Sequence, residues 1–81
     1  MSDELFSKIG ARVIALRKEL GISQEGLAER ANTSPVYLSR IESGKQKPSV
    51  QTLNRLAKAM DIPLYAFFYM GCRTETFSAS I

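Results

Sequence analysis

The sequence has no histidine and only one cysteine, Cys72, among its 81 residues. Without histidine and with a single thiol, the chain offers none of the familiar zinc-ligand clusters and cannot form an intramolecular disulfide. An enzyme is not expected, because a glycine-rich phosphate loop is also missing and no histidine can act as a base for Cys72. Cys72 is interpreted as a structural or incidental thiol, and we predict no metal, cofactor or small-molecule ligand.

Long apolar runs are also missing from the sequence. No stretch approaches the roughly 20 apolar residues of a membrane span, and the acidic start Ser2-Asp3-Glu4 does not resemble a signal peptide. We therefore predict no membrane partner, and the cysteine usage is typical of the reducing cytoplasm. The formal net charge of +3 is compatible with a polyanionic partner, although many proteins without such a partner are equally basic.

What the sequence does contain is a pair of short helix patterns within residues 23–44. Ser23 is placed to cap a helix over about 24–31, and Ser34, followed by proline, is placed to start a helix over 35–43. The residues between them leave room only for a sharp corner. A helix, a short turn and a second helix form the arrangement that lays a recognition helix in the major groove of DNA.

The remaining pattern predicts an all-α domain with five helices. Apolar residues in the first helix recur at steps of four, four, three and four, which places them on one stripe: Leu5, Ile9, Val13, Leu16 and Leu20. Gly21 ends this helix, Ser49 caps a fourth, and Pro63 opens a very apolar fifth helix over 64–70. We predict a compact helix-turn-helix domain over residues 5–70, and a tail over 71–81 that is a candidate part of a dimer interface.

The helix over 35–43 has a predicted reading face. At about 100° per residue, Leu38 and Ile41 point inward. The side chains that we predict to contact DNA bases lie around the opposite side: Pro35, Val36, Ser39, Arg40 and Ser43. Arg40 can chelate O6 and N7 of guanine, which is the commonest base-specific contact. The alternative is that Arg40 is a solvated arginine on an exposed helix face.

The rim of the same helix pair carries polar and basic residues suited to backbone phosphates, namely Gln24, Thr33, Ser34, Tyr37, Lys45 and Lys47. Gln24 lies at a helix N-terminus, where its amide and the free backbone N–H groups can meet a phosphate. Helix capping by Gln24 and Ser34 is compatible with such a contact. The alternative to a phosphate contact for Lys45 and Lys47 is that they belong to a solvated linker.

Arg17 and Glu42 form a predicted pair. Each lies about 70–80° off the buried axis of its own helix. If the first helix packs on the helix over 35–43, the two side chains form a partly buried ion pair that fixes the recognition helix. The alternative is that they are two unrelated surface charges.

The apolar fifth helix predicts a homodimer. A helix that is apolar around most of its circumference is buried on more than one side, and an 81-residue monomer has little core left to cover the second side. The predicted interface residues lie in this helix and in the tail: Leu64, Tyr65, Phe67, Phe68, Tyr69, Phe77 and Ile81. One of Phe67 and Phe68 is expected to pack on the domain's own core.

These residues together resemble the Cro/lambda-repressor-like helix-turn-helix family, also called the XRE family, over about residues 9–68. The segments that carry the resemblance occur in order: Ile9-Gly10, Leu16-Arg17, 21–25, Leu27-Ala28, 37–44, Pro48-Ser49, Thr52-Leu53 and 56–59. The resemblance implies a five-helix domain that binds operator DNA as a homodimer and regulates transcription. In the family's pattern Gln24 contacts a backbone phosphate, the helix over 35–43 reads bases, and Arg17 pairs with Glu42.

Three positions depart from the family's pattern. Gly26 replaces a helix-favouring residue, Ile14 lies on the outward side of the first helix where Arg or Lys is usual, and Pro63 replaces a serine cap. A second function class also stays open: a small antitoxin-like or other protein-interaction module whose DNA binding is secondary. A salt-sensitive affinity of the isolated chain for DNA separates the two classes.

Overall fold

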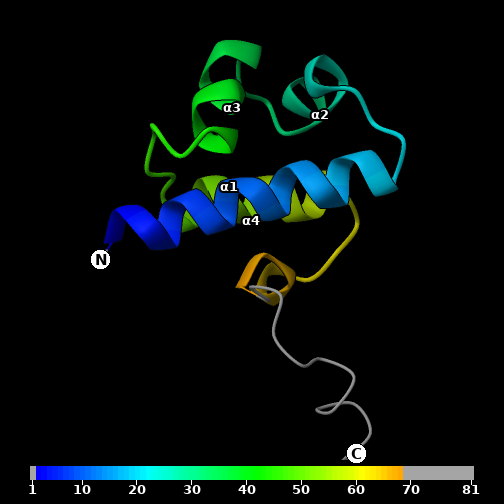
Figure 1. Cartoon of the computed structure of the whole chain (residues 1–81). Coiled ribbons are helices and arrows are strands. Elements are labelled where there is room, and N and C mark those ends of the chain that lie inside the picture. The colour runs from blue at the N-terminus through cyan, green and yellow to red at the C-terminus, as the bar shows by residue number, and fades with distance from the viewer. Residues whose placement is uncertain (1, 69–81) are drawn as a thin grey trace, which may run out of the picture.

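The computed structural model describes residues 2–68, which form four α-helices followed by a 3-10 helix (Figure 1). In chain order these are α1 (Ser2–Glu19), α2 (Gln24–Arg30), α3 (Pro35–Glu42), α4 (Val50–Ala59) and η1 (Leu64–Phe68). The predicted all-α fold is confirmed, while the tail over 71–81 lies outside the described residues. Within residues 2–68, each helix is too short or too polar to cross a bilayer.

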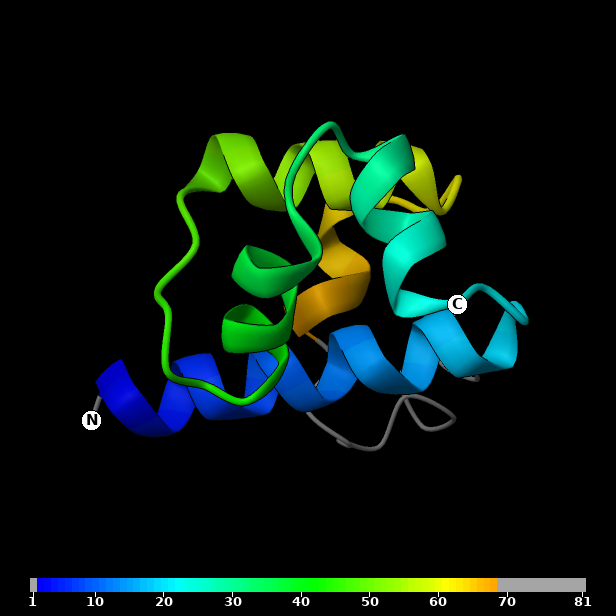
Figure 2. The ribbon, with the colours of Figure 1, turned by 90° about the horizontal axis from the view of Figure 1, so that it is seen from above.

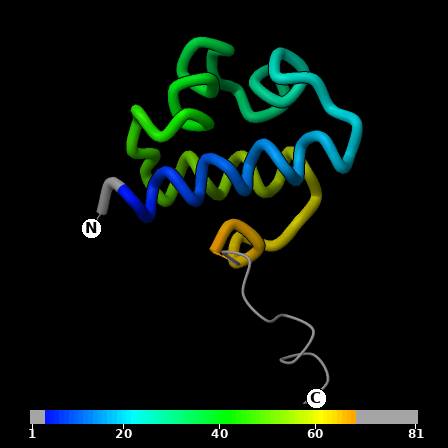
Figure 3. The backbone as a smooth tube through the Cα atoms, in the orientation of Figure 1, coloured from blue at the N-terminus to red at the C-terminus, as the bar shows by residue number. Residues whose placement is uncertain are grey.

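The helices are arranged in layers around one core. Helices α2 and α3 lie on one side of α1 and α4, and η1 lies on the other side (Figures 1 and 2). The tube in Figure 3 shows how the chain returns beneath α1 and α4 to place η1 there. Every layer contributes fully buried side chains: Ile9, Val13, Leu27, Leu38, Ile41, Leu56 and Phe67. The core therefore supports α3 from behind, leaving its opposite side uncovered.

Three predicted helix starts are confirmed at atomic detail. The hydroxyl oxygen of Ser23 accepts the backbone N–H of Gly26 at 2.9 Å, and that of Ser34 accepts the N–H of Tyr37 at 3.0 Å. Ser49 caps α4 in the same way. Each hydroxyl satisfies an N–H group that the first helical turn leaves unpaired.

The corner between α2 and α3 depends on Asn32. This residue has φ of +58°, in the left-handed region that asparagine tolerates better than most residues. The next backbone N–H, from Thr33, donates to the carbonyl oxygen of Ala28 at 2.9 Å. The chain therefore reverses within the predicted short turn, and Ser34 can start α3 at once.

The predicted amphipathic helix is present as α1, and its apolar stripe is buried in the middle but not at its two ends. Ile9, Val13 and Leu16 lie in the core, whereas Leu5 is 42% exposed and Leu20 is 48% exposed. At 1.5 Å per residue α1 is about 27 Å long. Figure 2 shows that both of its ends extend past α2 and α3, so the terminal leucines have little to pack against.

The fifth helix differs from its predicted form. The described part is a 3-10 helix, in which the N–H of Ala66 donates to the carbonyl oxygen of Pro63 at 3.0 Å. The side chain of Arg12 holds η1 against α1, because its Nε donates to the carbonyl oxygen of Ala66 at 2.9 Å. Ile14, predicted to face outward, is half-buried.

At Gly10 the backbones of α1 and α3 come very close together. A Cβ at this position would clash with the carbonyl oxygen of Ile41 and would lie 2.7 Å from that of Glu42. Both obstacles are backbone atoms, which cannot rotate away as a side chain can. Glycine is therefore required for the two helices to pack at this distance.

Candidate nucleic-acid interface

Helix α3 has one buried face and one exposed face. Leu38, Ile41 and Glu42 point inward and are buried. The predicted base-contacting residues are all exposed: Pro35, Val36, Ser39, Arg40 and Ser43. The structure thus brings these side chains to one uncovered surface, and their contact with bases stays a prediction.

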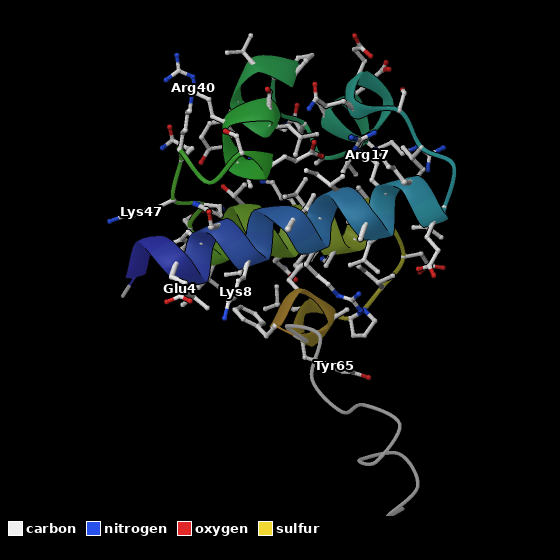
Figure 4. All side chains as sticks on the ribbon, in the orientation of Figure 1. Glu4, Lys8, Arg17, Arg40, Lys47 and Tyr65 are labelled. Atoms are coloured by element: carbon white, nitrogen blue, oxygen red, sulfur yellow. The ribbon has the colours of Figure 1, made fainter. Side chains whose placement is uncertain are left out.

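Arg40 and Ser43 differ in what they can offer to a base. Arg40 has no ion-pair partner within residues 2–68, and Figure 4 shows its side chain pointing away from the protein body. Its guanidinium group therefore retains the full set of donors that guanine recognition requires. The hydroxyl of Ser43 donates to the carbonyl oxygen of Arg40 at 3.1 Å, which leaves it mainly as an acceptor.

The C-terminal end of α3 is held by a hydrogen-bonded ion pair. Arg17 Nε donates to Glu42 Oε2 at 2.9 Å, and Arg17 Nη2 donates to Glu42 Oε1 at 3.2 Å. This two-pronged geometry is the strong form of an arginine–carboxylate pair. The side chains are 13% and 4% exposed, respectively, so water screens the pair only weakly. The predicted pairing of α1 with α3 is present in the structure.

Two further groups complete this network, and sequence reasoning missed both. Arg17 Nη1 donates to the backbone carbonyl of Ile22 at 3.1 Å. Gln24 Nε2 donates to Glu42 Oε1 at 2.9 Å. A single carboxylate therefore joins α1, α2 and α3. The sequence shows that Gln24 lies at the start of α2. Its contact with Glu42 could not be predicted, because it depends on how α2 and α3 pack in the folded chain.

This contact limits how Gln24 can meet a phosphate. One hydrogen of its amide nitrogen is used by Glu42, so a phosphate would share the same nitrogen through the second hydrogen. Gln24 is half-buried, and its amide is positioned before any ligand arrives. The predicted phosphate contact stays a prediction, now with a defined donor.

The other predicted phosphate residues lie around α3 in different settings. The hydroxyl of Ser34 is used as the helix cap, and Tyr37 is half-buried against the core. Thr33 is half-buried in the turn. Lys45 and Lys47 are exposed in the linker after α3, and Figure 4 shows Lys47 on the same side of the view as Arg40.

The structure separates the predicted dimer residues into three groups. Phe67 is fully buried in the core of its own chain, so its assignment to the interface is wrong. Leu64 is half-buried, whereas Tyr65 and Phe68 are 60% and 44% exposed. The remaining candidates lie outside the described residues: Tyr69, Phe77 and Ile81.

Comparison with known proteins places this arrangement in a family. The family model described as helix-turn-helix, HTH_3, matches residues 13–67. The chain is 43% identical over 58 residues to the immunity repressor protein of Bacillus phage phi105, covering 72% of this chain and 40% of the repressor. It is 40% identical over 68 residues to the transcriptional regulator SinR of Bacillus subtilis, covering 83% of this chain and 61% of SinR.

A solved structure shows the same fold. The restriction-modification controller protein C.AhdI from Aeromonas hydrophila superimposes with a TM-score of 0.77 at 33% sequence identity. The match covers 78% of this chain and 96% of C.AhdI. Because the family model spans more than half of the sequence, the chain belongs to the HTH_3 helix-turn-helix family, the XRE-like family of transcriptional regulators.

Proposed function

We propose that the chain is a transcriptional regulator that binds a palindromic operator as a homodimer, with α3 in the major groove. The observation that carries this proposal is the position of Arg40 on the outward face of a helix whose inward face is anchored in the core. Arg40 is exposed and has no ion-pair partner among residues 2–68. The names of the relatives, an immunity repressor and a restriction-modification controller protein, support a role as a repressor or controller.

The exposed face of α3 offers three complementary chemistries to base edges. Arg40 can donate two hydrogen bonds to guanine, and Ser39 can donate or accept at several bases. Val36 is 65% exposed and can pack against the methyl group of thymine. This short helix reaches only a few base pairs, so stable specific binding requires a second copy of the domain. Two-fold symmetry then gives an inverted repeat whose half-sites are about 10 base pairs apart.

Replacing Arg40 with alanine should relax the operator preference at one position of each half-site. The binding free energy for the preferred base should fall by about 1–3 kcal/mol, because a bidentate contact to guanine disappears. Selection of binding sites from random duplex DNA, followed by sequencing, measures this effect. A selected motif identical to that of the wild type would show that Arg40 is not a reading residue.

The matched control is Lys45→Ala, which removes a cation without touching the reading face. It should weaken binding to all sequences alike and lower the salt slope by about one. The same titrations test the broader proposal. If the isolated chain has no salt-sensitive affinity for duplex DNA, the protein-interaction module becomes the better interpretation.

Replacing Phe68 with glutamate should dissociate the homodimer while leaving the monomer folded. Phe68 is 44% exposed on η1, so the added charge is tolerated in the monomer and is costly only where a partner covers it. Sedimentation at micromolar concentration measures the oligomeric state. Leu20→Glu is the control, because Leu20 is 48% exposed at the far end of α1.

Truncation after Gly71 separates the two parts of the predicted interface. Loss of the dimer in the truncated chain assigns the interface to residues 72–81, and an intact dimer assigns it to η1. The dimer proposal fails if the full chain sediments as a monomer and binds one half-site as tightly as a palindrome.

A further inference from the structure

A hollow with a basic lining lies between α2, the turn that follows it, and α4. Its volume is about 280 Å³, and its lining includes Arg30, Asn32, Arg55 and Lys58. The three cationic residues are all exposed, and none has an ion-pair partner within the described part of the chain. Three positive charges around one concave surface repel each other, so an anion bound there relieves an unfavourable interaction.

Helix stability alone does not account for this cluster. Arg30 and Lys58 lie in the last turns of α2 and α4, where a cation interacts favourably with the free carbonyl groups of the helix end. Arg55 lies in the middle of α4 and has no such role. The helix ends therefore account for two of the three cations, and Arg55 adds a third positive charge at the same hollow.

An adjoining hollow is partly apolar. Its volume is about 460 Å³, it shares Arg30 and Ala59 with the basic hollow, and Leu20, Ile22 and Met60 line it. Leu20 is 48% exposed and therefore offers apolar surface at this hollow. Asp61 also lines this hollow. The two hollows together make one groove, with a basic end and a mixed end that carries Leu20 and Ile22, and we call it the α2–α4 groove.

We propose that the α2–α4 groove binds a short acidic peptide segment of a partner protein. Its carboxylates pair with Arg30, Arg55 and Lys58, and an apolar side chain of the same segment packs against Leu20 and the half-buried Ile22. Duplex DNA fits less well, because its backbone supplies phosphates but no apolar side chain for the second hollow. A peptide with an acidic stretch next to a leucine or similar residue satisfies both ends.

The groove is separate from the surface proposed to read DNA. Within residues 2–68, the lining of both hollows comes from the end of α1, the turn after it, α2, the turn before α3, α4 and Asp61. Arg40, Lys45 and Lys47 line neither hollow. The cations of the groove are therefore distinct from the residues predicted to read bases, while Ser23 and Gly26 of the second hollow flank Gln24, which is predicted to contact a phosphate.

The test is a titration of the full chain into a fluorescently labelled peptide made of glutamates with one central leucine, read by anisotropy. Wild-type protein should bind this probe with an affinity that falls as salt rises. The variant Arg55→Glu with Lys58→Glu should bind at least about tenfold more weakly, because repulsion replaces two charge-assisted contacts. Circular dichroism should show that these exposed substitutions leave the fold intact. The double variant Arg55→Ser/Lys58→Ser removes the same two positive charges without adding negative ones, and it serves as a second, milder test.

Two controls assign the binding to the groove. Arg40→Ala should bind the probe as the wild type does, because Arg40 lies outside the groove. Leu20→Ser should weaken binding of the leucine-containing probe but not of an all-glutamate probe of the same length. A probe with glutamines in place of the glutamates should not bind.

Three outcomes would overturn the proposal. The first is equal affinity of the wild type and the Arg55 and Lys58 double variants for the probe. The second is an equally large loss in Arg40→Ala, which would place the probe on the reading face. The third is displacement of the probe by duplex DNA together with a lower salt slope for DNA binding in the double variants, which would make the groove a phosphate contact.

Discussion

Replacing Gly10 with alanine should lower the free energy of unfolding by about 3 kcal/mol or more, the largest loss expected of any single methyl group in this chain. The added methyl group meets the backbone of α3 at Ile41 and Glu42, so α1 and α3 must move apart. Overpacking of a core costs about 1–3 kcal/mol and more where nothing can give way, and here the obstacle is backbone. Small domains have little stability to lose, so a loss of about 3 kcal/mol or more should shift the urea midpoint strongly.

Gly26→Ala is the matched control for this substitution. Gly26 also lies inside a helix, but an added Cβ there meets only side-chain atoms, the nearest being the hydroxyl oxygen of Ser23 at 3.0 Å. Alanine favours the helix by about 1 kcal/mol over glycine, so stability should stay within about 1 kcal/mol of the wild type. Equal stability of the Gly10 and Gly26 variants would contradict the close packing of α1 on α3.

Replacing Glu42 with alanine should weaken folding and DNA binding together. Removing one partner of a buried ion pair costs about 3–5 kcal/mol, because the remaining charge is left without compensation. Arg17 would lose two of its three hydrogen bonds, and Gln24 would lose the acceptor that orients its amide. Thermal unfolding followed by circular dichroism measures the first effect, and titration of operator DNA measures the second.

A double-mutant cycle isolates the pair. The double variant Arg17→Ala/Glu42→Ala should lose less free energy of unfolding than the two single variants lose in sum. The reason is that the double variant buries no unpaired charge. Glu4→Ala is the control, because the Glu4–Lys8 pair is exposed and spans 3.6 Å between its charged atoms. Glu4→Ala should lower the free energy of unfolding by about 0.5 kcal/mol or less. Additive effects at Arg17 and Glu42 would show that the two residues are not coupled.

The features predicted correctly from the sequence depend on short stretches of chain. A serine before a helix accepts an N–H group only three residues later, as Ser23, Ser34 and Ser49 do, so its immediate neighbours are enough to identify it. The periodicity of α3 likewise separates Leu38 and Ile41 from Arg40 without any tertiary contact.

The features missed or assigned wrongly depend on what another element places nearby. Leu5 and Leu20 share the stripe of Ile9 but lie beyond the neighbouring layers, and a helical pattern contains no information on where its neighbours end. Phe67 and Phe68 are adjacent in an apolar run, so the sequence leaves open which of them the core takes. The engagement of Gln24 by Glu42 requires the angle between α2 and α3, which emerges only on folding.

The division of α3 into an anchored face and an uncovered face has an evolutionary consequence. Substitutions at exposed positions away from special contacts usually change stability by no more than about 0.5 kcal/mol. Val36, Ser39 and Arg40 can therefore drift with little effect on folding. Under the proposed function these same positions choose the operator, so duplicated copies of this gene can diverge to separate targets through a few exchanges on an unchanged scaffold.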